Sequence, residues 1–263
     1  MSIIKNEIPI LEFDTDKKAI LEPGHERLNL VLPEKCVFAF LGEHVDEYAH
    51  QNNAQITAYF ESATKNFPIY VINYKGEHIT LCQAPVGAAA AAQMLDWLIC
   101  YGVRSVIATG SCGCLESLPE DALLIPYKAL RDEGTSYHYA PPSRYIDVNV
   151  RAMEALESVL NLHQIRHCRV VTWSTDGFFR ETAEKVAYRR SEGCSVVEME
   201  CSALVACAGF RGITFGMLLY TADTLAAADN YDHRNWGRGS KKIALELCVE
   251  AVLSLGEDEH EYC

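Results

Sequence analysis

Residues 197–223 read VEMECSALVACAGFRGITFGMLLYTAD, and they join a helical pattern to a buried strand. The apolar spacing over 199–209 predicts a helix, and the unbroken apolar run over 213–222 is typical of a strand covered on both faces. Comparable strand-like runs occur at 36–42, 68–74, 79–85, 105–111, 122–127 and 168–173. Helical patterns alternate with them at 88–101, 148–162, 181–190 and 240–255. Helices placed between buried strands predict an α/β fold with a largely parallel or mixed sheet.

The composition is that of one globular domain. The 263 residues contain no repeat or long linker, so we expect a single domain with about 35 N-terminal residues as an extension and an acidic tail at 256–263. A formal charge of −13 argues against a nucleic-acid partner. The eleven cysteines show no C-x-x-C spacing, which argues against a metal site and fits free thiols in a reducing compartment. The N-terminus lacks a secretory pattern and no apolar run is long enough to cross a bilayer, so we expect a cytoplasmic protein without membrane contact.

Unusual polar residues follow several of the expected strands, where ligands bind in open α/β sheets. In ATGSCGCL, residues 108–115, Gly110 and Ser111 would let backbone N–H groups approach an anion or a sugar, although a plain turn explains the same letters. The segment RDEGTSYHYAPP, 131–142, is either an ordered polar wall of a site or a solvated loop.

Three further segments carry candidate site residues. In STDGFFRET, Phe178 or Phe179 could stack on a flat heterocycle, although paired phenylalanines more often belong to a core. Glu198 and Glu200 stand at the entry of an apolar helix, where a carboxylate can accept both hydroxyls of a sugar or simply cap the helix. Asp223 follows an apolar strand, so burial should raise its pKa and suit it to proton donation; a turn-forming Asp is the alternative.

Taken in order, VEMECSAL, GSCG and RDEGTSYHY resemble the nucleoside phosphorylase superfamily, which contains the purine nucleoside and uridine phosphorylases and their hydrolase relatives. The resemblance runs from about Cys36 to the last expected helix. It implies a three-layer αβα fold with a twisted mixed sheet, no cofactor besides phosphate as co-substrate, and a homo-oligomer (a dimer or a trimer of dimers) with sites shared between subunits.

The resemblance also implies roles for single residues. Glu200 would accept the ribose 2′- and 3′-hydroxyls, Met199 would pack on the sugar, and Glu198 would line the same pocket. Phe178 would flank the base. Asp223 would protonate or hydrogen-bond purine N7, which favours purine substrates because the pyrimidine enzymes lack that acid.

The expected nucleophile region comprises Gly42, Gly110, Ser111 and Arg131. The sequence departs from the family there, because phosphorolytic members carry G-D-P-x-R where this chain reads GEHVD, with Asp46 in the place of the arginine. A second phosphate arginine is replaced by Ala108. Loss of two guanidinium groups removes most of the charge-assisted, bidentate hydrogen bonds that such a site makes to phosphate.

Other basic side chains could bind phosphate instead: Arg131, Arg180, His44, His138 or an arginine from a neighbouring subunit. The leading hypothesis is therefore a purine nucleoside phosphorylase. The alternatives are a nucleosidase that uses water and a nucleoside-binding homologue without turnover. Residues 226–238 are expected to fold over the base pocket, with His233, Arg234 and Trp236 as lid residues, although an ordinary surface loop fits as well.

Overall fold

The computed structural model describes residues 3–226 and 231–255; the acidic tail at 256–263 and part of the expected lid lie outside the described residues. Its strands are β1 (Lys35–Ala39), β2 (Gln55–Glu61), β3 (Asn66–Tyr74), β4 (Glu77–Gln83), β5 (Ser105–Cys114), β6 (Leu123–Asp132), β7 (Tyr145–Asp147), β8 (His167–Thr175), β9 (Cys194–Glu198) and β10 (Thr214–Thr224). Its α-helices are α1 (Glu43–Gln51), α2 (Ala88–Cys100), α3 (Val150–Leu162), α4 (Ala183–Ser191), α5 (Cys201–Arg211) and α6 (Lys241–Ser254). Four short 3-10 helices complete it: η1 (Pro9–Leu11), η2 (Thr135–His138), η3 (Phe178–Arg180) and η4 (Arg234–Gly237).

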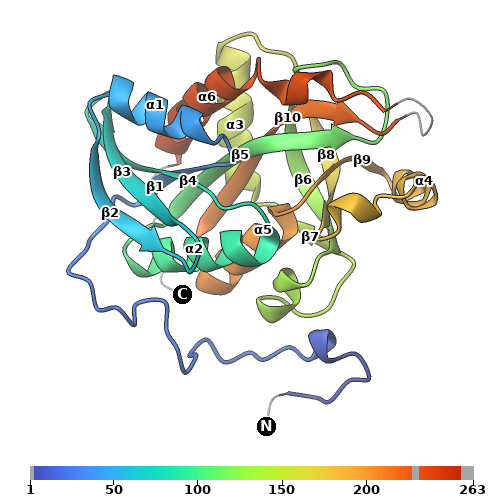
Figure 1. Cartoon of the computed structure of the whole chain (residues 1–263), viewed down its shortest axis with the longest axis horizontal. Helices are drawn as coiled ribbons and strands as arrows, with labels where there is room; N and C mark the ends of the chain where they lie inside the picture. Colours follow the sequence, from blue (N-terminus) through green and yellow to red (C-terminus); the bar gives the residue numbers. More distant parts are fainter. Residues whose placement is uncertain (1–2, 227–230, 256–263) are drawn as a thin grey trace.

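Helices cover both faces of one central sheet (Figure 1). Helices α1, α3 and α6 lie on one face, where α6 packs on β1 and β5 and α3 on β10. Helices α2 and α5 pack against each other on the opposite face, with α5 against β6 and β10. These three layers confirm the αβα architecture that the sequence predicts. No helix in the described part of the chain is both long and apolar enough to span a membrane.

The sheet is mixed and partly closed on itself. Its strand order is β10-β6-β8-β9-β5-β1-β4-β3-β2, and β10 also pairs with β5, so β10, β6, β8, β9 and β5 form a ring. Strand β5 runs parallel to both β1 and β10, with Ile107 opposite Val37 and Gly216. Ile107 is fully buried, as the continuous apolar pattern of β5 predicts. The ring brings the ends of β5, β9 and β10 to one place.

Helix α1 and strands β2, β7 and β9 were not expected from the sequence. Helix α1 buries only Val45 and Ala49, so its apolar stripe is too thin to detect. The solvent-exposed edge strand β2 has only Phe60 fully buried. The short β9 ends at Glu198, and Glu200 is the N-cap residue of α5 rather than part of the helix, so both acids lie at a strand-to-helix junction.

Residues 3–34 carry no strand or α-helix, and their only regular element is η1. They run beside α2 and α5 at the lower edge of the molecule in Figure 1. Arg211 of α5 ties this segment down, because its guanidinium donates to the Lys17 carbonyl oxygen at 3.0 Å while it pairs with Asp96 of α2 at 2.7 Å.

Candidate functional site

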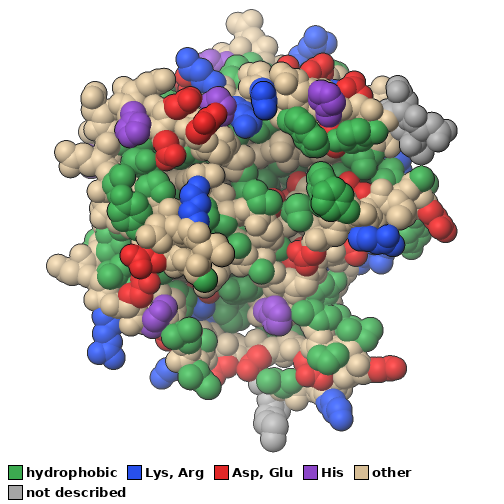
Figure 2. Space-filling model, in the orientation of Figure 1, with side chains coloured by type: hydrophobic (Ala, Val, Ile, Leu, Met, Phe, Trp, Pro, Cys, Tyr) green, Lys and Arg blue, Asp and Glu red, His purple; other side chains and the backbone are tan. Residues whose placement is uncertain are grey.

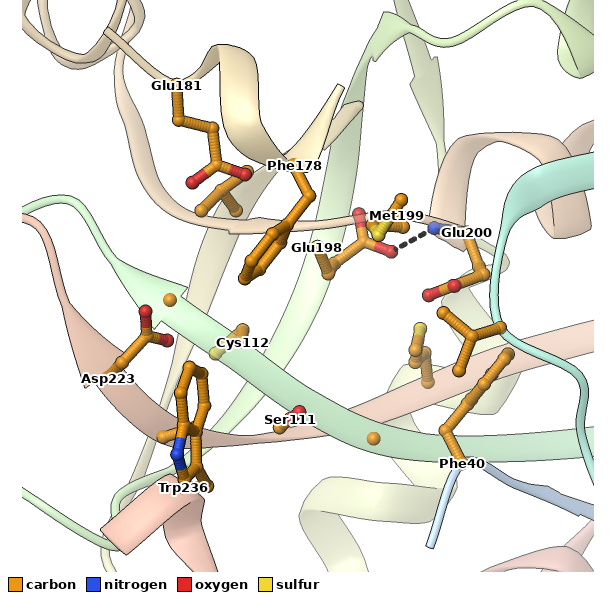
Figure 3. Close-up of a pocket in the computed structure, with 16 residues that line it drawn as sticks. Phe40, Ser111, Cys112, Phe178, Glu181, Glu198, Met199, Glu200, Asp223 and Trp236 are labelled. Atoms are coloured by element: carbon orange, nitrogen blue, oxygen red, sulfur yellow. Dashed lines mark hydrogen bonds between the residues drawn. The ribbon is translucent and has the colours of Figure 1, made fainter. Parts of the chain in front are cut away.

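A cavity opens where β5, β9 and β10 end. It is lined by residues that come from seven parts of the chain: Phe40, Val86, Gly110, Ser111, Cys112, Gly113, Phe178, Glu181, Val197, Glu198, Met199, Glu200, Met217, Ala222, Asp223 and Trp236 (Figure 3). The molecular surface is hollowed over β5 and β9, with hydrophobic side chains around the hollow and acidic atoms within it (Figure 2). The fold therefore brings together eight of the residues that the sequence analysis singled out: Gly110, Ser111, Phe178, Glu198, Met199, Glu200, Asp223 and Trp236.

Two glycines let the cavity walls approach β5 closely. A Cβ on Gly113 would lie 2.8 Å from Leu225 Cδ1 and 3.2 Å from Asp223 Oδ1. A Cβ on Gly110 would lie 3.2 Å from Phe40 Cβ. The strand can thus present its backbone and the exposed Ser111 to the cavity, as the sequence predicts for this segment.

Glu198 is buried in the cavity wall and caps helix α5. One carboxylate oxygen accepts hydrogen bonds from the hydroxyls of Ser174 at 2.5 Å and Thr172 at 3.1 Å. The other accepts from the backbone N–H groups of Glu200 at 2.7 Å and Cys201 at 2.6 Å. Burial raises the pKa of Glu198, and these four donors oppose that rise. Both oxygens are therefore engaged by the protein, as the capping interpretation of this acid expects.

Glu200 is held differently, because its carboxylate points into the cavity (Figure 3). The residue is only 6% exposed, and one oxygen accepts a hydrogen bond from the Gly87 N–H at 2.6 Å. Gly87 has φ +98°, a conformation that favours glycine, so the turn before α2 is built to present this N–H group. Burial, followed by the charge of Glu198, raises the pKa of Glu200 to about 8. A buried acid with a free side toward a cavity is suited to bind hydroxyl groups.

The other end of the cavity holds a second pair of acids. Asp223 is 7% exposed, and its pKa is raised by burial, against the opposing effects of a hydrogen bond from the Tyr231 hydroxyl and the charge of Arg234. Burial and then the charge of Asp223 raise the pKa of Glu181 to about 7. An acid with its pKa near neutrality can donate a proton to a leaving group.

Aromatic rings stand beside these acids (Figure 3). Phe178 lines the cavity from η3 and Trp236 lines it from η4, although 44% and 46% of these residues are exposed. Phe179 is 92% exposed and meets Phe178 edge-on outside the lining. Phe178 is therefore the ring of the pair that faces the cavity. Large exposed aromatics at a cavity mouth suit stacking on a flat ring.

Sequence reasoning missed Glu181, because it stands at the start of a helical pattern and looks like an ordinary first-turn acid. Its position three residues after Phe178, in a segment that follows a strand end, was the available signal. The lining residues Phe40, Val86 and Met217 were missed as well, because isolated apolar residues carry no functional pattern.

Arg131 does not line the cavity. Its buried guanidinium donates to Ser136 Oγ at 2.9 Å, Ser143 Oγ at 2.8 Å and the Pro141 carbonyl oxygen at 2.7 Å, and it stacks 4.3 Å from the Tyr137 ring centre. Burial lowers its pKa. Arg131 therefore orders the polar segment after β6 through four hydrogen bonds. Its assignment to the nucleophile region stays a prediction.

The remaining candidates for anion binding also lie outside the lining. Gly42 is the N-cap of α1 with φ +62°, and within α1 Asp46 accepts a hydrogen bond from the Tyr70 hydroxyl at 2.8 Å while His44 lies 3.3 Å from Glu47. Ala108 is fully buried in the middle of β5, between Phe38 and Met217 of the flanking strands. Gly42 is not among the residues that line the cavity, whereas Phe40, two residues earlier, lines it.

Two more cations are placed elsewhere. His138 lines a separate cavity under the N-terminal segment, and Arg180 is exposed on η3. Of the expected lid residues, Trp236 lines the cavity, Arg234 donates to the Leu118 carbonyl oxygen at 2.9 Å, and His233 accepts from the Asn235 N–H and stacks on Trp236. Within the described residues, no group of three or more His, Cys, Asp or Glu could hold a metal ion.

Comparisons with known proteins agree on the family. The family model described as "Phosphorylase superfamily" matches residues 34–253. The guanosine phosphorylase of Halorubrum lacusprofundi is 26% identical over 202 residues, which cover 73% of this chain and 82% of that protein. Two solved structures share the fold at 21% identity. The uridine phosphorylase of Vibrio fischeri ES114 has a TM-score of 0.74 and covers 84% of this chain and 92% of its own, and the AMP nucleosidase of Bacteroides thetaiotaomicron VPI-5482 has a TM-score of 0.69 and covers 84% and 88%.

The match over residues 34–253 includes every described strand and both acids at the entry of α5, in line with the resemblance seen in VEMECSAL. A guanosine phosphorylase is thus among the sequence relatives of this chain, and an AMP nucleosidase is among the proteins that share its fold. The chain belongs to the phosphorylase superfamily.

Proposed function

We propose that this enzyme cleaves the N-glycosidic bond of purine ribonucleosides and that water, rather than phosphate, takes up the sugar. The observation that carries the proposal is the lack of basic side chains in the cavity lining: it contains the acids Glu181, Glu198, Glu200 and Asp223, and none of its described lining residues is a lysine or arginine.

Glu200 is suited to hold the sugar. Its carboxylate points into the cavity and is fixed by the Gly87 N–H, so its free side can accept two vicinal ribose hydroxyls. Cleavage passes through a sugar with oxocarbenium character, and this positive charge favours the ionised form of an acid whose pKa is raised to about 8 in the empty cavity. The interaction therefore strengthens as the glycosidic bond breaks, which lowers the barrier.

Asp223 is suited to help the base leave. Burial raises its pKa, so near neutral pH it can donate a proton or a hydrogen bond to N7 of a purine. Phe178 and Trp236 can hold the flat base beside it. The electron pair of the broken bond then goes to a protonated, neutral base instead of a purine anion.

The lack of basic side chains in the cavity lining favours water over phosphate as the nucleophile. A phosphate dianion that leaves water needs charged donors to offset its desolvation, and the described cavity lining supplies no guanidinium or ammonium group. The two positions where the family carries arginines hold Asp46 and Ala108, and the donors of Arg131 are used by its own loop. Water carries no such cost, and the exposed Ser111 hydroxyl and the backbone of β5 can position it.

Phosphorolysis is the second candidate, and the similarity to a guanosine phosphorylase favours it. In that case a neighbouring subunit of a homo-oligomer would supply the missing arginine. Incubation of the purified protein with inosine, adenosine and uridine, with and without phosphate, separates the candidates. Release of purine base at a rate that phosphate does not change supports the proposal. Release that requires phosphate overturns its choice of nucleophile, and binding without any release indicates a homologue that lacks turnover.

A further inference from the structure

A buried hydrogen-bond network holds the first turn of α5, which directly follows Glu200. Ser174, Ser202 and Glu133 belong to this network, and all three are buried and lie outside the cavity lining. The Ser202 N–H donates to Ser174 Oγ at 3.0 Å, and the Ser202 hydroxyl donates to Glu133 Oε1 at 2.8 Å. The backbone and the side chain of Ser202 are thus bound by two different parts of the chain, the end of β8 and the segment after β6.

Glu133 is itself held in place by its own segment. Its second oxygen, Oε2, accepts a hydrogen bond from the Ser136 N–H at 2.9 Å. The next residue, Gly134, donates its N–H to Asp176 Oδ2 at 2.8 Å, which joins this segment to the loop after β8. Both oxygens of Glu133 therefore accept hydrogen bonds, one from its own segment and one from α5. An acid that is fixed in this way can hold the residue that it binds.

Charge keeps the Glu133 carboxylate at this position. A buried carboxylate is costly unless nearby charges and donors offset its desolvation. Arg131, which is buried in the same segment, supplies an opposite charge, and the charge of Glu133 in turn opposes the lowering of the Arg131 pKa by burial. Glu133 also contacts the first turn of a helix, where the helix dipole favours an anion.

Glu200 stands at the end of this network. It is the N-cap residue of α5, two positions before Ser202, and its N–H donates to Glu198 at 2.7 Å. Its carboxylate accepts from the Gly87 N–H and turns its free side to the cavity (Figure 3). The direction of that free side depends on the backbone of Glu200 and hence on the position of the first turn of α5. A shift of about 1 Å in such a group can cost up to about 100-fold in rate.

We propose that Glu133 is a positioning residue for the cleavage reaction: through its hydrogen bond with Ser202 it fixes the first turn of α5 and so directs the Glu200 carboxylate at the sugar hydroxyls. The inference rests on the proposed function, because it assigns a supporting acid to the same sugar site. It holds whether water or phosphate takes up the sugar. Glu133 touches no substrate atom and moves no proton.

The test removes the Ser202 hydroxyl with Ser202→Ala, both in the wild-type enzyme and in Glu200→Gln. It measures kcat/KM for the purine ribonucleoside that the wild type cleaves fastest. The matched control is Thr80→Val, which removes an equally buried hydroxyl from β4, outside the cavity lining, that donates to the Pro33 carbonyl oxygen at 3.0 Å. Each substitution removes one hydrogen bond and should lower the melting temperature by about 2–6 °C.

We expect Ser202→Ala to lower kcat/KM about tenfold in the wild-type background and less than about twofold in Glu200→Gln, because the charge-assisted contact that the network directs is already absent there. Thr80→Val should change kcat/KM less than about twofold in both backgrounds. Equal fold-losses for Ser202→Ala in the two backgrounds would overturn the inference and leave the proposed function intact. Wild-type kcat/KM in Ser202→Ala would do the same, and failure to cleave any nucleoside would remove both.

Substitutions at Glu133 test the acid directly. Glu133→Gln keeps an oxygen that can accept from the Ser202 hydroxyl, whereas Glu133→Ala does not, so Glu133→Gln should retain about threefold or more of the kcat/KM of Glu133→Ala. Adding Ser202→Ala to Glu133→Ala should cause no further loss. A further loss of about tenfold would assign the effect of the hydroxyl to another partner and overturn the inference. If Glu133→Ala does not fold, the comparison of Ser202→Ala in the two backgrounds decides by itself.

Discussion

The substitution Glu200→Gln should lower the activity of the enzyme and raise the stability of its fold. Glu200 is 6% exposed, and its pKa is raised from 4.5 to about 8 by burial and by Glu198. Between these two pH values the folded protein keeps a proton that the unfolded chain has lost. The contribution of Glu200 to the free energy of unfolding is therefore fully present below pH 4.5 and is lost as the pH rises to about 8. At about 1.4 kcal/mol per unit of pKa, the loss approaches about 5 kcal/mol at pH 8.

Glutamine does not titrate, and its carbonyl oxygen can still accept from the Gly87 N–H. The melting temperature of Glu200→Gln should therefore rise above that of the wild type as the pH increases, by about 7 °C between pH 5 and pH 8 at about 2 °C per kcal/mol. Other titrating groups are common to both proteins and cancel in the difference. Differential scanning calorimetry from pH 5 to pH 8 measures it, with Glu184→Gln as the exposed control. A difference between variant and wild type that does not change with pH would refute the burial of this acid.

The same variant should lose activity. Two charge-assisted hydrogen bonds to ribose hydroxyls, each worth about 1.5–3 kcal/mol, become neutral ones, so kcat/KM for ribonucleosides should fall about 100-fold. Binding of the free purine base should change little, because Glu200 lies at the other end of the cavity. Loss of base binding together with loss of turnover would place Glu200 outside the sugar site.

Three further substitutions test separate parts of the site. Asp223→Asn should lower kcat for neutral purine nucleosides by about 100-fold or more with little change in KM, as steady-state kinetics will show; unchanged kcat would exclude a proton donor here. Trp236→Ala should raise KM about tenfold through loss of stacking, and a changed kcat with constant KM would contradict a role in base binding. Arg131→Lys should lower the free energy of unfolding by about 2–3 kcal/mol in a denaturant titration, because a lysine cannot reproduce the bonds to Ser136 and Pro141, and should leave activity per folded molecule unchanged. A loss of activity without a loss of stability would place Arg131 in the nucleophile region.

The core of the fold was readable because its strands are buried on both faces. Ile107 and Leu218 lie in continuous apolar runs that only a covered sheet tolerates, and the helices between such strands fix the layers. Helix α1 and strand β2 were not predicted, because few of their residues are buried and their apolar patterns are weak. The closure of the sheet through β10 and β5 depends on twist, which a hydrophobic pattern does not encode.

Candidate site residues could be predicted where a charged residue stands inside an apolar segment of the sequence. Glu200 and Asp223 are acids in apolar segments, and this conflict marks them without any structure. Glu181 lies in a polar segment, so its importance arises only from the tertiary contact that places it near Asp223. The hydrogen bonds of Arg131 to carbonyl and hydroxyl oxygens of its own loop were not predictable for a similar reason, because they form only in the folded loop.

The choice of nucleophile is the central claim, and the sugar product tests it most directly. Purified enzyme is supplied with the purine nucleoside that it cleaves fastest, in ¹⁸O-labelled water with phosphate present, and the sugar is analysed by mass spectrometry under conditions that quench exchange at C1. An acidic cavity lined by Glu181, Glu200 and Asp223 predicts free ribose that carries one ¹⁸O atom, formed at a rate independent of phosphate. Ribose 1-phosphate as the product, formed only when phosphate is added, would contradict the account.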